Sequence, residues 1–159
     1  MDSVDVFSKK YKFYKLILCL VDGKMRNILE KVGPNAGMVW GTLDAQGSLI
    51  QAKLIETTRL NEEEFYAAVG WLARENKICE DGTTYKLGET NLTDKIGGNA
   101  GKIWKVIHTW REVDASYVPG LAGLNAEETY CALGWLAREG KIMVKMVKPI
   151  EHQIKFELK

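Results

Sequence analysis

The string Gly-Trp-Leu-Ala-Arg-Glu occurs at residues 70–75 and again at residues 134–139. The match extends outward from both strings at a constant offset, so that residues 32–78 align with residues 96–142 without a gap. Of the 47 aligned positions, 19 are identical, far more than chance would give. A fixed internal offset with this much identity indicates that one unit has been duplicated. The sequence therefore predicts two copies of a small domain.

Three parts of the chain follow from the repeat: an N-terminal extension at 1–24, a first copy at 25–90 and a second copy at 91–159. The extension has no counterpart in the repeat, and we expect it to pack on the copies or to fray. A nucleic-acid-binding arm is the alternative, because residues 9–15 mix Lys with Tyr and Phe. The segment at 88–95 spans at most about 28 Å when extended. We therefore expect the copies to pack on each other as a pseudo-dimer.

The first helix of each copy is predicted from a polar cap and an apolar stripe. Asn35 and Asn99 are candidate caps, and Trp40 and Trp104 fall on the expected core side of the helix. Ser48 is the candidate cap of the second helix in the first copy. In the second copy the Pro-Gly pair at 119–120 predicts that this helix is short or distorted.

The third helix of each copy has the clearest start signal. An asparagine is followed three residues later by a glutamate, which predicts an Asn variant of the capping box at Asn61 with Glu64 and at Asn125 with Glu128. An apolar stripe with helical spacing then follows and includes Leu72 and Leu136.

Tryptophan and glycine stand side by side on each third helix. Trp71 and Trp135 are predicted to be packed in the core, and Gly70 and Gly134 beside them indicate room for a ring or a neighbouring backbone. Trp110 has no counterpart in the first copy and is expected to be the most exposed tryptophan.

After each third helix the apolar period changes from 3.6 to 2. The Asp-Gly pair at 81–82 predicts a tight hairpin in the first copy, and residues 142–147 with 153–158 predict a second hairpin. The predicted fold is α+β and mainly helical: three helices and a β-hairpin wing, written twice as a tandem winged helix-turn-helix.

Both copies share three motifs: Gly-x-Asn-Ala-Gly-x-x-Trp, Leu-Asn-x-Glu-Glu, and Gly-Trp-Leu-Ala-Arg-Glu-x-Lys-Ile. This pattern resembles a family of small, uncharacterised winged helix-turn-helix proteins of bacteria and archaea. The resemblance covers residues 32–87 and 96 to about 158. It implies the fold, and by analogy a role like that of transcription regulators.

Composition excludes several classes of protein. The formal net charge of +1 gives no global attraction to nucleic acid or membrane, and no apolar run reaches the roughly 20 residues of a membrane span. Three cysteines at 19, 79 and 131 argue against a disulfide framework and for a reducing, cytoplasmic location. His108 and His152 have no partners at metal-ligand spacing. We therefore expect that the protein is not an enzyme and that it binds neither a metal ion nor a cofactor.

The charge distribution leaves the partner open. The start of each third helix, which normally enters the DNA major groove, carries glutamates that would face phosphates. Lysines concentrate instead in the second copy, where candidate nucleic-acid contacts are Lys102, Lys105, Lys141, Lys145, Lys148 and Lys155. Because most proteins of this shape bind DNA, we predict a double-stranded DNA-binding, regulator-like protein whose second wing contacts phosphates. The alternative, which the local charge favours, is a winged-helix protein-interaction module that does not bind DNA. A small-molecule sensor has no feature in its favour.

Overall fold

The computed structural model describes residues 16–18, 24–110, 113 and 115–144. In the first copy, α3 (Val32–Gln46) is followed by β2 (Leu49–Ile50), α4 (Gln51–Thr58) and α5 (Glu62–Arg74). The strands β3 (Ile78–Asp81) and β4 (Thr84–Leu87) then form the wing, and α2 (Lys24–Glu30) precedes the whole unit. The sheet is antiparallel in the order β2-β4-β3. This order of helices and strands is a winged helix.

The second copy repeats the helices with local changes. A π-helical turn (Thr93–Gly97) leads into α6 (Gly98–Trp110), and a 3₁₀ turn (Ala115–Tyr117) leads into α7 (Val118–Ala122). The helix α8 (Ala126–Arg138) and the strand β5 (Ile142–Val144) complete the described part of this copy. The five-residue α7 confirms the predicted shortening, and Pro119 lies in its first turn, where a missing N–H breaks no helical bond.

The N-terminal extension contributes one described strand, β1 (Leu16–Leu18). It pairs in parallel with β5, with residue 16 opposite residue 142. Residues 16–18 of the extension therefore pack on the second copy, in agreement with the expectation that the extension packs on the copies. The return strand expected at 153–158 lies outside the described residues.

Each copy has an apolar core that the other copy helps to complete: Leu92, Ile96 and Cys131 join the first core, and Leu29 joins the second. In the first copy Phe65 is fully buried and meets the ring of Tyr85 edge-on at 5.4 Å. In the second copy the core includes Ile103, Ile107 and Leu133, and Thr129 replaces the phenylalanine. The Thr129 hydroxyl is satisfied inside this core because it donates to the Asn125 carbonyl at 2.7 Å.

The predicted caps of the first two helices are wrong. The helix α3 begins three residues before Asn35, whose backbone N–H already donates to the Lys31 carbonyl, and the side chain is buried. Asn99 likewise lies inside a continuous helical run that starts with the π turn. Ser48 does not cap α4, because the next two residues pair with β4 as strand β2 and the helix starts at Gln51.

Trp40 is also not a core residue. The apolar buried residues of α3 are Val32, Ala36, Val39 and Leu43. Trp40 lies one position away from this stripe, with 40% of its surface exposed. Its counterpart Trp104 is half-buried against the second core. Trp110 is 60% exposed, the largest value among the described tryptophans, as the sequence predicts.

Candidate functional site

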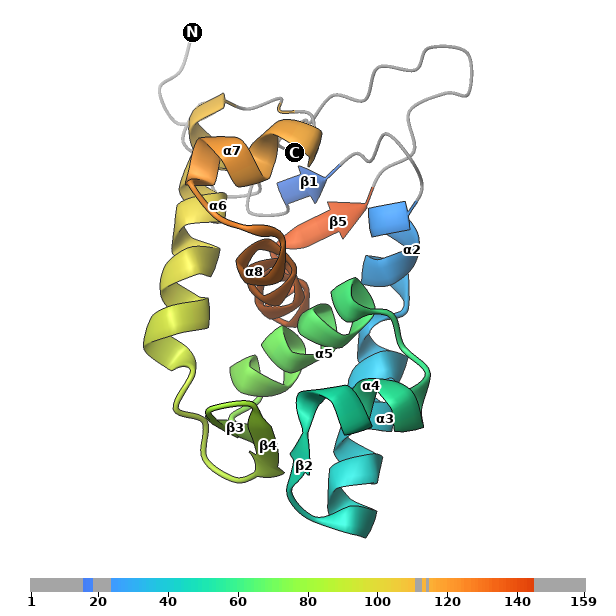
Figure 1. Cartoon of the computed structure of the whole chain (residues 1–159). Helices are drawn as coiled ribbons and strands as arrows, with labels where there is room; N and C mark the ends of the chain where they lie inside the picture. Colours follow the sequence, from blue (N-terminus) through green and yellow to red (C-terminus); the bar gives the residue numbers. More distant parts are fainter. Residues whose placement is uncertain (1–15, 19–23, 111–112, 114, 145–159) are drawn as a thin grey trace, which may run out of the picture.

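The third helices of the two copies, α5 and α8, cross at the centre of the molecule (Figure 1). A Cβ atom added to Gly70 would lie 1.8 Å from the Cys131 carbonyl oxygen, and one added to Gly134 would lie 1.9 Å from the Ala67 carbonyl oxygen. These two contacts exchange equivalent positions of the repeat, since Ala67 aligns with Cys131. The glycines therefore allow one backbone to touch the other, which is one of the two uses the sequence suggested.

The same reciprocity governs the charged contacts between the helices. Arg74 Nε donates to Glu139 Oε1 at 2.9 Å, and Arg138 Nε donates to Glu75 Oε1 at 2.8 Å. Each guanidinium also lies 5.5 Å from the centre of a tryptophan ring of the other copy, Arg74 over Trp135 and Arg138 over Trp71. Contacts that repeat in this way have the form of an interface around a two-fold axis.

The glutamates of these ion pairs are held ionised. Burial opposes the charge of Glu139, but hydrogen bonds from Lys141 and Arg74 outweigh it and keep its pKa below the ordinary value. Glu75 has the same balance with Lys77 and Arg138, and its pKa is lowered as well. Both pairs are therefore intact near neutral pH.

Both capping boxes are present at the starts of these helices. Asn61 Oδ1 accepts from the Glu64 N–H at 2.8 Å, and the Glu64 carboxylate accepts from the Asn61 N–H at 3.0 Å. Asn125 and Glu128 make the same two bonds at 2.9 and 3.0 Å. Leu72 and Leu136 are buried below them, while Trp71 and Trp135 are half-buried between the copies.

Little of either third helix reaches the surface. Within α5 only Glu62 and Arg74 are exposed, and within α8 only Ala126 and Arg138. The apolar positions between these ends pack on the two cores, while the side chains of Glu63 and Glu127 keep 29% and 41% of their surface exposed. The middle of each helix, at residues 67–70 and 131–134, is therefore buried.

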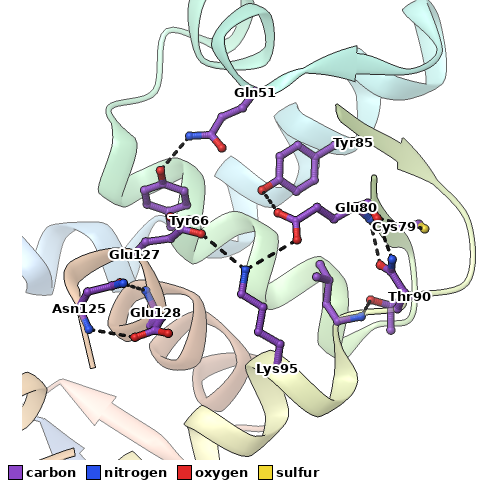
Figure 2. A network of polar contacts seen from close by, with 12 residues as sticks. Gln51, Tyr66, Cys79, Glu80, Tyr85, Thr90, Lys95, Asn125, Glu127 and Glu128 are labelled. Atoms are coloured by element: carbon purple, nitrogen blue, oxygen red, sulfur yellow. Dashed lines mark hydrogen bonds and ion pairs between the residues drawn. The ribbon is translucent and has the colours of Figure 1, made fainter. Parts of the chain in front are cut away.

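The acidic starts of the third helices take part in ion pairs. Glu63 binds Lys24 at 2.7 Å, and this contact holds the pKa of Glu63 below its ordinary value. Lys95 lies 3.7 Å from both Glu127 and Glu80, and so joins α8 to β3 of the first copy (Figure 2). The Tyr85 hydroxyl donates to the same Glu80 carboxylate at 2.7 Å. The ion pairs of Lys95 between the copies therefore include a residue of the first wing, Glu80.

Three of the six candidate nucleic-acid lysines are described. Lys102 and Lys105 are exposed on α6, and Lys102 also donates to Asn99 at 3.2 Å. Lys141 is exposed and pairs with Glu139 at 2.9 Å. The other three, Lys145, Lys148 and Lys155, lie outside the described residues.

A cavity of about 460 Å³ lies between α6 and the end of α8. Its walls are formed by two indoles, three small residues, a leucine and two charged residues: Gly97, Ala100, Gly101, Trp104, Trp135, Leu136, Glu139 and Lys141. All eight are identical in the other copy. Trp104, Trp135, Leu136 and Lys141 stand out in the sequence for other reasons, but nothing in it predicts that they line one cavity. The signal that could have found it is Gly37 with Gly101, a helix-interior glycine kept in both copies.

The described residues offer little reactive chemistry. They contain no cluster of three His, Cys, Asp or Glu side chains that could hold a metal ion. Burial, reinforced by Glu127, raises the pKa of the Cys131 thiol and keeps it protonated. The imidazole ring of His108 stacks on the indole of Trp104, with 4.7 Å between the ring centroids. No helix in this part of the chain is long and apolar enough to cross a membrane.

Fold and helix pair together define a tandem winged-helix protein. The family model described as "Winged helix-turn-helix domain (DUF2582)" matches residues 25–87 and 91–153, and the chain belongs to this family. No curated protein and no solved structure shows a significant match to the chain.

Proposed function

We propose that this tandem winged-helix protein acts as a covalent pseudo-dimer that binds other proteins, and that its third helices do not read DNA. The observation that carries the proposal is the crossing of α5 and α8, with only the ends of each helix exposed. A recognition helix contacts base edges from its N-terminal residues while lying in the major groove. To lie in the groove, α5 would have to separate from α8. Separation would expose the apolar side chains and the backbone that are buried between the two helices.

Charge supports the same conclusion. The first turn of α5 carries Glu62, Glu63 and Glu64, and that of α8 carries Glu127 and Glu128. Affinity for duplex DNA comes mainly from cations that replace the condensed counterions of the phosphates. Carboxylates at the expected contact point reverse this attraction.

A second candidate function is regulator-like DNA binding through the second copy alone. It is favoured by the exposure of Lys102 and Lys105 on α6, away from the helix crossing, and of Lys141, which also pairs with Glu139. In this alternative the lysines contact phosphates, together with the sequence neighbours Lys145, Lys148 and Lys155.

A duplex-DNA titration of the full chain over a salt series tests the proposal. We expect to find no duplex binding of the kind whose affinity falls steeply as the salt concentration rises. Salt-steep binding that Glu62→Lys with Glu63→Lys strengthens would overturn the proposal, because helix three would then approach DNA. Salt-steep binding that Lys102→Glu with Lys105→Glu abolishes would instead establish the second candidate.

A further inference from the structure

The cavity between α6 and α8 retains its walls in both copies to a degree that the fold does not require. All eight wall positions are identical between copies, although only 19 of 47 aligned positions are. Fully buried core positions have changed over the same duplication: Val39 aligns with Ile103, Leu43 with Ile107, and Phe65 with Thr129. All of the wall positions have therefore been kept, whereas several core positions have changed.

Part of this retention follows from the contact between copies. Gly97 lies under the Trp135 ring, where an added Cβ would be 3.2 Å from the ring carbon Cζ2, and Glu139 binds Arg74 across the interface. Lys141 binds the same Glu139 at 2.9 Å, and Trp104 packs on the second core, so only Gly101 has neither reason. Packing on a neighbouring group does not explain why Gly101 is retained.

Gly101 and its counterpart Gly37 are the most informative wall residues. Each lies inside a helix with ordinary negative φ, and a Cβ added to either would meet nothing within 4 Å. Glycine in a helix interior costs about 1 kcal/mol relative to alanine. Neither backbone geometry nor close packing offsets this cost, so the open space above the helix is itself the retained feature.

The chemistry of the cavity fits an apolar side chain accompanied by negative charge. Trp104 and Trp135 supply two indole rings, and indoles favour flat or bulky apolar groups. The exposed charges at the rim are cations: Lys141 has 46% of its side chain exposed and Arg74 has 44%, whereas Glu139 has 15% and is already paired with both. Lys105 adds a further exposed cation one turn along α6 from Gly101.

We propose that this cavity is a docking site for an acidic peptide segment of a partner protein, which inserts one aromatic or aliphatic side chain between Trp104 and Trp135. Carboxylates beside that side chain meet Lys141 and Lys105. The first copy keeps the equivalent residues Gly37, Trp40, Trp71 and Lys77 but has Gly41 in place of Lys105. The inference rests on the proposed protein-binding function and names the class of partner.

Nuclear magnetic resonance of the full chain tests the inference at millimolar concentration of a short probe peptide, acetyl-Asp-Glu-Phe-Glu-Asp-amide. We expect the indole N–H signals of Trp104 and Trp135 to shift on titration and that of Trp110 to stay. The same peptide with Lys and Arg in place of its acids should shift them at least about tenfold less readily, which corresponds to about 1.4 kcal/mol.

Filling the cavity supplies the matched comparison. Gly101→Leu should abolish the shifts and leave the thermal midpoint equal or higher, since the added side chain has room. Gly98→Leu is the control, because residue 98 is also exposed with nothing within 4 Å of its Cβ position but does not line the cavity. This variant should bind like the wild type.

Three results would overturn the inference. They are the absence of shifts with the acidic peptide, equal shifts in Gly101→Leu, and stronger shifts with a single-stranded oligonucleotide, whose bases also stack on indoles. These outcomes are distinct from failure of the proposed function, which is measured by duplex DNA and the substitutions on α5.

Discussion

Gly70 and Gly134 set how closely the two copies approach. Because a Cβ on Gly70 would lie 1.8 Å from a backbone oxygen, no side-chain movement can relieve the contact. We expect Gly70→Ala to lower the free energy of unfolding by about 3 kcal/mol, at the upper end of overpacking costs. Urea unfolding of the full chain measures this difference.

Gly37→Ala is the control for that substitution. It adds the same methyl group to a helix where nothing lies within 4 Å, and should raise the free energy of unfolding by up to about 1 kcal/mol. Equal stability of the Gly70→Ala variant and the wild type would show that the two backbones do not touch at this point.

The helices α5 and α8 start with the same capping box, and its loss should have the same cost in each. Asn61→Ala and Asn125→Ala should each lower the free energy of unfolding by about 1 kcal/mol. Asn61→Ser retains an acceptor and should stay within a few tenths of the wild type. If the alanine and serine variants unfold alike, the cap bonds contribute nothing to stability.

The ion pairs between α5 and α8 should make stability depend on pH in the acid range. The folded-state pKa values of Glu75 and Glu139 lie below their ordinary value of 4.5, so their contribution is complete above that value and is lost as the pH falls through the folded pKa. The free energy of unfolding should therefore decrease on acidification below pH 4.5.

The variant Glu75→Gln with Glu139→Gln isolates this contribution. It should be less stable than the wild type at neutral pH, and its stability should fall less steeply below pH 4.5. Thermal unfolding of both proteins over a range of pH measures this difference. If the stability of the two proteins falls in parallel with pH, other carboxylates govern the loss of stability in acid.

Helix starts and core stripes with strong local signals could be predicted from the sequence, and weaker ones could not. The boxes at Asn61 and Asn125 depend on bonds within four residues, so sequence is sufficient there. Asn35 seemed equally suitable as a cap, but the helix starts earlier, at Val32, which is buried against Ala67 of the neighbouring helix. The strand β2 is two residues long and exists through pairing with β4, a partner more than 30 residues away.

In the whole molecule, the duplication predicted that the copies would pack together but not which surfaces would meet. Gly70 and Gly134 indicated a close contact in the sequence. A glycine next to a tryptophan, however, can make room either for an aromatic ring or for a neighbouring backbone, and the sequence does not distinguish the two. The exchanged pairs of Arg74 with Glu139 and Arg138 with Glu75 become visible only when both copies are in place. The cavity could not be predicted for the same reason, because its residues come from two segments, 97–104 and 135–141, that are more than 30 positions apart.

The contact between α5 and α8 can be observed directly in solution, with and without duplex DNA. Nuclear Overhauser effects between the Hα protons of Gly70 and Cys131, and between those of Gly134 and Ala67, report on the two backbone crossings. We expect both effects in the free chain, unchanged when excess duplex is added at low salt. Their absence from the free chain, or their loss on addition of DNA, would show that the third helices separate and are free to enter a groove.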